Sequence, residues 1–204
     1  MRSNSRNDIL EAARRLFLRF GYNGVSMRAI AKEAGITTGA VYFHFRRKSD
    51  IYAAVCLEAG DMLIQRFREG MAASSGPNRK LISIFDSFMS FFHEKREYYN
   101  ILMEHRTEYR ESDDSRNDEI MMKMAGIVRE IDGPLRMGMQ NGTFRDIDPG
   151  MTSLLLAIIA EGLLQYKRIG LLDYLNVRDG EFRRFMADVV GRGIQAKARK
   201  GDMK

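Results

Sequence analysis

Apolar residues recur three or four positions apart along most of this chain, a spacing that places them on one face of an α-helix. The pattern predicts a first helix that ends at Gly21, with the following residues recurring at helical spacing: Ile9, Ala13, Leu16, Phe17 and Phe20. Residues 26–45 predict two shorter helices. Ser26 and Thr37 are typical helix N-caps, and Gly35 can supply the left-handed residue between the helices. The first 45 residues therefore predict a three-helix bundle that contains a helix-turn-helix.

The second helix of this motif carries the candidate chemistry, because a helix-turn-helix places the N-terminal half of that helix in the major groove of DNA. Helical spacing turns Val41 and Phe45 inward. It turns outward the positions Thr38, Gly39, Tyr42 and His44. Lys48 opens the next predicted helix, where its ammonium can meet a phosphate beside the positive end of the helix dipole.

Charge is distributed unevenly along the 204 residues. Residues 1–50 hold ten Lys or Arg against four Asp or Glu, whereas residues 51–204 hold 23 of each, so the whole net charge of +6 lies with the predicted helix-turn-helix. A phosphate backbone would be attracted to this end of the chain. A charged, solvated face without a partner is the alternative.

Six further helical segments follow the bundle. A connecting helix over 48–67 is long enough to act as a rigid lever, and the small, Gly- and Ser-rich segment 70–77 predicts a linker. Gly133 and Pro134 interrupt a long apolar stripe, which predicts a kink or a break. Asp148 and Pro149 are a strong helix start. The predicted helices after the linker cover residues 79–95, 98–109, 118–140, 151–170 and 179–197.

The last two predicted helices are more apolar than one small domain can cover. We expect them to form an isologous interface, a four-helix bundle with two helices from each subunit of a homodimer. The alternative is that both are core helices of a monomer. The predicted interface residues are Leu155, Ile158, Ile159, Leu163, Phe182, Met186, Val189, Val190 and Ile194.

The sequence lacks the signals that are typical of several other classes of protein. The N-terminus has no continuous apolar core of a signal peptide, and residues 154–160, the longest apolar run, fall short of the roughly 20 residues that span a bilayer. We therefore expect a cytoplasmic protein without a membrane partner. No nucleophile elbow, phosphate-binding glycine loop or paired histidine motif is present, so we expect no enzyme, no cofactor and no metal. Cys56 is expected to be a buried thiol, with a redox sensor as the alternative.

These residues resemble the tetracycline-repressor (TetR) family of bacterial regulators. The resemblance covers about a quarter of the chain and rests on Ile9, Ala12, Phe17, Gly21, Tyr22, Ser26, Ile30, Ala31, Ala34, Gly35, Gly39, Tyr42, His44, Phe45 and Lys48. It implies an all-α homodimer of about nine helices. A DNA-binding domain (1–47) would precede an effector-binding and dimerisation domain (48–204), whose connecting helix spans 48–70.

The resemblance also implies residue roles. Arg28 and Lys48 would contact phosphates, with Arg28 able to read a base, and Tyr42 could serve either role. The DNA-binding set is Arg28, Thr37, Thr38, Gly39, Tyr42, His44 and Lys48. Thr38 and Ala40 are small where relatives often carry longer polar side chains, so base readout would rest on few contacts and DNA shape would carry part of the specificity.

In the family, the three helices after the connecting helix enclose a ligand pocket. The matching lining here is Phe85, Phe88, Met89, Phe92, His105, Tyr109, Met121, Met124 and Val128. Flexible methionines and few polar groups favour a small apolar effector, aromatic or acyl-bearing. Such a ligand would release a repressor from its palindromic, double-stranded operator by moving the connecting helix. The stripe could instead be plain core, or the apolar half could dock a protein and bind no small ligand.

Overall fold

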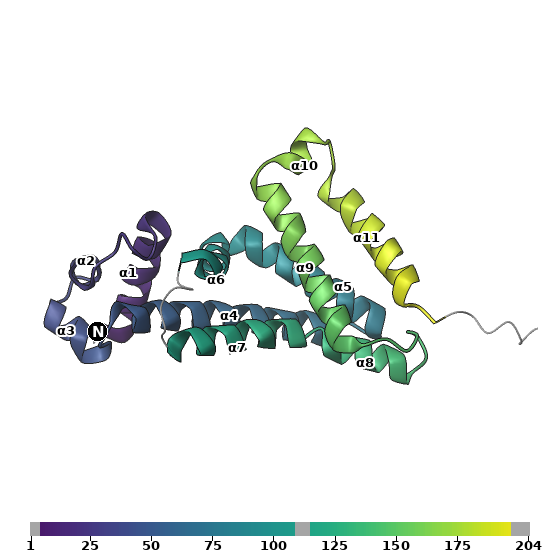
Figure 1. Cartoon of the computed structure of the whole chain (residues 1–204), viewed down its shortest axis with the longest axis horizontal. Coiled ribbons are helices and arrows are strands. Elements are labelled where there is room, and N and C mark those ends of the chain that lie inside the picture. The colour runs from purple at the N-terminus through teal and green to yellow at the C-terminus, as the bar shows by residue number, and fades with distance from the viewer. Residues whose placement is uncertain (1–4, 109–114, 197–204) are drawn as a thin grey trace, which may run out of the picture. The chain divides into compact units, whose positions relative to one another are not determined.

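The computed structural model describes residues 5–108 and 115–196. Within these residues the chain forms eleven helices and no strand, so the predicted all-α fold class is confirmed. The helices, shown in Figure 1, are α1 (Ser5–Phe20), α2 (Met27–Glu33), α3 (Thr38–His44), α4 (Lys48–Ala72), α5 (Pro77–Glu94), α6 (Arg96–Glu108), α7 (Ser115–Arg129), α8 (Asp132–Gln140), α9 (Pro149–Arg168), α10 (Leu171–Tyr174) and α11 (Asp179–Ile194).

Packing divides the chain into two compact units, each built from two segments. The first unit contains Met1–Leu63 and Phe91–Ala125, and the second contains Ile64–Ser90 and Gly126–Lys204. Helices α4, α5 and α7 contribute residues to both units. The predicted domain boundary after residue 47 does not coincide with this division into packing units, and it stays a prediction.

The core of the first unit is formed by α1 to α4, with Ile101 of α6 and Ile120 of α7 packed into the same cluster. Three aromatic rings join α1, the turn after it and α4. The ring of Tyr52 lies 5.1 Å from that of Phe17 and 5.1 Å from that of Tyr22, both edge-on. The small three-helix bundle therefore completes its core by packing against α4, as expected for a bundle of this size.

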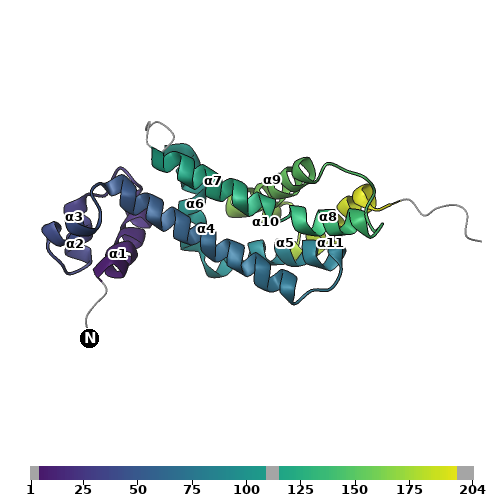
Figure 2. The same ribbon diagram turned by 90° about the horizontal axis from the view of Figure 1, so that it is seen from below.

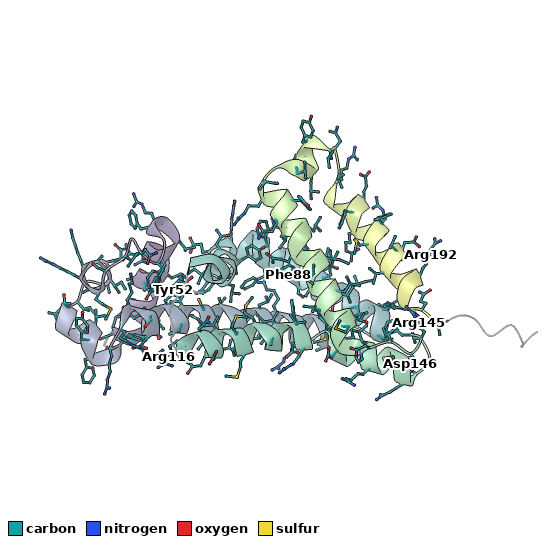
Figure 3. All side chains as sticks on the ribbon, viewed as in Figure 1. Tyr52, Phe88, Arg116, Arg145, Asp146 and Arg192 are labelled. Carbon is teal, nitrogen blue, oxygen red and sulfur yellow. The ribbon has the colours of Figure 1, made fainter. Side chains whose placement is uncertain are left out.

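In the second unit, α9 and α11 are joined through the short helix α10 (Figure 1). The C-terminal end of α11 lies beside α8 (Figure 2), where the backbone N–H of Arg145 donates to the Ile194 carbonyl at 2.9 Å. The guanidinium of Arg145, labelled in Figure 3, donates to the Gly193 carbonyl at 2.7 Å. The guanidinium of Arg183 on α11 donates twice to the Asp86 carboxylate on α5, at 2.6 Å each.

Two predicted boundaries are confirmed, and the predicted linker is shorter than expected. The Asp148 carboxylate caps α9 by accepting from the Met151 N–H at 2.8 Å, and the stripe around Pro134 breaks into α7 and α8. Of the predicted linker 70–77, only residues 73–76 lie outside the helices, because α4 continues to Ala72 and α5 begins at Pro77. Gly70 is a packing residue: a Cβ there would meet the Ser87 hydroxyl oxygen at 2.9 Å, so its absence lets α4 and α5 approach closely. The short helix α10 was not predicted.

Candidate DNA-binding site

The helix-turn-helix is fixed by two side-chain caps and one left-handed glycine. The Ser26 hydroxyl accepts from the Ala29 N–H at 3.1 Å at the start of α2, and the Thr37 hydroxyl accepts from the Ala40 N–H at 3.2 Å at the start of α3. Gly35, with a φ of +68°, turns the chain between the helices. A left-handed backbone conformation costs glycine little because glycine has no Cβ. All three predictions from sequence are confirmed.

The apolar residues of α3 determine which positions face outward. Val41 is fully buried and Phe45 nearly so, and both join the core of the first unit. This burial leaves Gly39, Tyr42 and His44 exposed, with Thr38 half-buried. The orientation of α3 therefore agrees with the sequence analysis, which placed these four positions outward.

Phe43 was missed by the sequence analysis. Its side chain is 85% exposed, against 53% for Tyr42 beside it. The signal was available in the spacing, because Phe43 lies midway between the two inward residues Val41 and Phe45 and four residues after Gly39. An apolar pattern assigns phenylalanine to the core by default, which hides a phenylalanine on the binding face.

The basic side chains around this site differ in whether they are held in ion pairs. Arg28 and Arg46 are exposed and form no ion pair with a described residue. Arg47 is paired with Asp50 at 3.2 Å. Arg116, labelled in Figure 3 at the start of α7, donates to the same Asp50 carboxylate at 3.3 Å. Arg28 and Arg46 are therefore the better placed cations for phosphate contacts.

Lys48 is engaged within the protein. Its ammonium donates to the carbonyl oxygens of Tyr22 at 2.6 Å and Val25 at 2.8 Å, and it lies 4.1 Å from the centre of the Tyr22 ring. Burial lowers the pKa of Lys48. Two of its three N–H groups thus hold the turn that leads into α2, which leaves one for a phosphate. The predicted phosphate role of Lys48 stays a prediction, beside a structural role that the sequence did not reveal.

Eight of the nine predicted pocket residues are described, and they are divided between the units. The second unit holds Phe85, Phe88, Met89 and Val128, and the first holds Phe92, His105, Met121 and Met124. Phe88, labelled in Figure 3, and Phe92 are buried, whereas Met121 is 51% exposed. Tyr109 lies outside the described residues, as does the side chain of His105. The pocket stays a prediction.

The nine predicted dimer residues fall into three groups by exposure. Leu155, Ile158 and Val189 are exposed, each by about half, and Leu163 and Ile194 are buried within the second unit of their own chain. The other four are half-buried: Ile159, Phe182, Met186 and Val190. Leu163 and Ile194 are therefore core residues, while the exposed ones leave an apolar surface on α9 and α11.

Three further expectations concern the Cys56 thiol, metal binding and membrane-spanning helices. Cys56 is fully buried, and burial raises the pKa of its thiol, which suits the predicted structural role. Among residues 5–108 and 115–196, no cluster of three His, Cys, Asp or Glu residues is arranged to hold a metal ion. No helix in the described part of the chain is both long and apolar enough to cross a bilayer.

Comparison with known proteins agrees with the geometry of the site. Residues 9–55 match the family model for bacterial regulatory proteins of the tetR family. The fatty acid metabolism regulator protein of Bacillus subtilis is 25% identical over 138 residues, which cover 68% of this chain and 70% of that protein. The transcriptional activator FasR of Mycolicibacterium smegmatis is 27% identical over 103 residues, covering 50% of this chain and 47% of FasR.

The fold extends the similarity beyond the matched residues. The crystal structure of AibR in complex with isovaleryl coenzyme A and operator DNA aligns with a TM-score of 0.64 at 20% identity, over 96% of this chain and 100% of AibR. The protein is thus a helix-turn-helix regulator that binds DNA. Over residues 9–55 the chain is similar to the TetR family.

Proposed function

We propose that the protein is a cytoplasmic repressor that binds a palindromic operator as a homodimer and is released by a small apolar effector of the acyl type. The observation that carries the release mechanism is the packing of α6, a helix of the effector-binding part, against α1 of the DNA-binding bundle. A hydrogen bond joins Arg14 on α1 to the Tyr98 hydroxyl on α6, and the Arg14 guanidinium lies 4.5 Å from the centre of the Tyr98 ring.

This contact gives an effector a direct route to the DNA-binding helices. Ile101, one turn after Tyr98, is buried in the same core as α1, so a shift of α6 would displace α1 and the turn that it supports. The connecting helix α4 offers a second route, because Lys48 holds that turn from the other side. A coupling of roughly 1–3 kcal/mol would change DNA affinity about 5- to 150-fold.

The acyl effector is supported by the relatives and by the composition of the predicted pocket. One relative is named for fatty acid metabolism, and AibR was crystallised with an acyl-coenzyme A. The predicted lining is rich in Phe and Met, which suits an acyl chain. The direction of regulation is less uniform among relatives, since FasR is named an activator.

The proposal is tested in two stages with the purified full-length protein. Selection of bound fragments from random DNA should return a palindrome whose half-sites lie about one helical turn apart. Fluorescence anisotropy on that labelled operator should then show release by one or more saturated acyl-coenzyme A thioesters, and no release by free coenzyme A. Recovery of no preferred sequence would refute operator binding, while an operator that no acyl ligand releases would refute the effector.

The alternative is that the apolar half docks a protein partner. A thermal-shift titration with the same thioesters distinguishes the two, because a ligand that binds only the folded state raises the unfolding temperature as its concentration increases. A concentration-dependent rise supports the pocket. A flat response to every thioester favours the docking surface.

A further inference from the structure

We infer that Phe43 reads thymine in the operator by apolar contact with the C5-methyl group. The inference rests on the proposed binding of a specific operator and adds a specificity residue to it. Phe43 is the most exposed of the large apolar side chains on the described surface, at 85%. Folding does not account for this position, because Val41 and Phe45 already fill the inward face of α3.

The surroundings of Phe43 leave its ring free to enter a groove. Helical side chains lean toward the N-terminus, so Phe43 leans over the turn that contains Gly39, four residues earlier. A Cβ added to Gly39 would find only the Thr37 hydroxyl oxygen within 4 Å, at 3.9 Å, so the space there is open. On its other side the ring meets His44, edge-on with ring centres 5.2 Å apart.

Base chemistry explains what such a ring could recognise. In the major groove the thymine methyl is the apolar group that distinguishes a base pair, and the other base edges present hydrogen-bond donors and acceptors. Thr38 and Ala40, the side chains next to Gly39, offer one hydroxyl between them. Exposed Arg28 and Arg46 supply charge for the phosphates. The site thus has attraction for DNA and an apolar probe, but few polar groups that read bases.

The decisive experiment removes the methyl group alone. Each thymidine of one half-site in the selected operator is replaced in turn by deoxyuridine, which keeps every hydrogen-bonding group of the base. Dissociation constants are measured by anisotropy for the wild-type protein, Phe43→Ala and Phe43→Leu. Phe20→Ala is the matched control, because Phe20 is an exposed phenylalanine (51%) on α1 rather than on α3.

We expect the wild-type protein to lose about fourfold in affinity at one or two positions, as for one buried methyl group of about 0.8 kcal/mol. Phe43→Ala should bind the thymidine operator more weakly and show no further loss at those positions. Phe43→Leu should keep part of the sensitivity, and Phe20→Ala should keep all of it. The unfolding temperature of Phe43→Ala should match that of the wild type, because the side chain is exposed.

Two results would overturn the inference while leaving operator binding intact. One is full sensitivity to deoxyuridine in Phe43→Ala. The other is an equal loss of affinity of Phe43→Ala for operator and random DNA, which would make Phe43 a contact to the sugar-phosphate backbone. Failure to recover any preferred sequence would instead overturn the proposed function, and the inference with it.

Discussion

At the scale of single residues, Lys48 has a role that its place at the start of α4 does not suggest. Its ammonium is the donor to two carbonyl oxygens of the turn before α2. We predict that Lys48→Met lowers the free energy of unfolding by about 1–3 kcal/mol, because these part-buried oxygens lose their partner. Chemical denaturation of the purified protein measures the change.

The control for this prediction is Lys32→Met, which removes an exposed charge on α2 and should leave the free energy of unfolding unchanged. DNA binding supplies the second measurement. If the third N–H of Lys48 meets a phosphate, Lys48→Met will also flatten the salt dependence of binding by about one unit. Equal stability of the two variants would show that the carbonyl contacts contribute little.

Gly138 on α8 allows close packing against Phe144. A Cβ at this position would overlap the ring of Phe144, which is almost fully buried. We predict that Gly138→Ala destabilises the protein by about 1–3 kcal/mol, the usual range for an overpacked core. Thermal and chemical unfolding would show the loss.

Gly126 on α7 is the matched control, since a Cβ there meets no atom within 4 Å. Gly126→Ala should be neutral or stabilising by up to about 1 kcal/mol, because alanine favours the helix. The double variant Gly138→Ala with Phe144→Leu should recover part of the stability lost in Gly138→Ala. If Gly138→Ala unfolds like the wild type, the neighbouring ring must shift at little cost.

Residues whose role is local were predictable from sequence, and residues whose role is tertiary were not. The caps Ser26 and Thr37 act on N–H groups three residues away, so their spacing is visible in the chain. The bonds of Lys48 reach back more than 20 residues, and no periodicity records them. The exposure of Phe43 was not predictable for a different reason. Composition alone does not distinguish an apolar residue that packs inward from one that faces a partner.

At the scale of helices, the same distinction explains the boundaries. Asp148 and Pro149 signal a helix start by their own chemistry, and α9 begins there. Gly70 signals a turn in isolation, yet α4 runs through it because α5 packs closely against that position. The pocket was predicted by analogy of helix order, and its eight described residues fall in two packing units, so sequence periodicity alone could not bring them together.

The contact between α1 and α6 gives a prediction for regulation. Burial, with a contribution from the Glu58 carboxylate, raises the pKa of Tyr98. The phenol is neutral at neutral pH, as in an ordinary tyrosine, and its oxygen accepts the hydrogen bond from Arg14. We predict that Tyr98→Phe, which removes only the hydroxyl, binds the operator within about twofold of the wild type but responds less to the effector. Operator affinity with and without saturating acyl-coenzyme A measures the coupling.

Tyr174→Phe is the control for this change, because Tyr174 is an exposed tyrosine on α10 of the second unit. It removes a hydroxyl without touching α1. Reduced release in Tyr98→Phe but not in Tyr174→Phe would place α6 in the coupling. Identical release in both variants and the wild type would leave α4 as the route.

At the scale of the whole molecule, the exposed apolar row on α9 supports the proposed homodimer. Met151, Leu155, Ile158, Tyr166 and Ile169 recur at helical spacing and are each roughly half exposed or more. An apolar row of this length on a helix marks an interaction surface. Val189 and Phe185 extend exposed apolar surface onto α11. A second copy of the chain would cover both helices through a two-fold axis.

We predict that Ile158→Glu converts the dimer into a monomer at micromolar concentration. The substitution places a carboxylate in the apolar interface twice, once from each subunit, and removes an aliphatic side chain worth about 1.5–3 kcal/mol of burial each time. The dimer dissociation constant should therefore rise at least about 100-fold. Light scattering coupled to size exclusion measures the mass, and Met122→Glu, a methionine 67% exposed on α7, should remain dimeric.

Operator binding should follow the oligomeric state. A monomer presents one recognition helix, so Ile158→Glu loses the effective concentration that couples two half-sites, a factor of about 10² to 10⁴. Its affinity for a single half-site should equal that of the wild type, since α3 is unchanged. A monomeric variant that still binds the full palindrome as tightly as the wild type would show that the two recognition helices act independently, and spacing by α9 and α11 would then have no part in specificity.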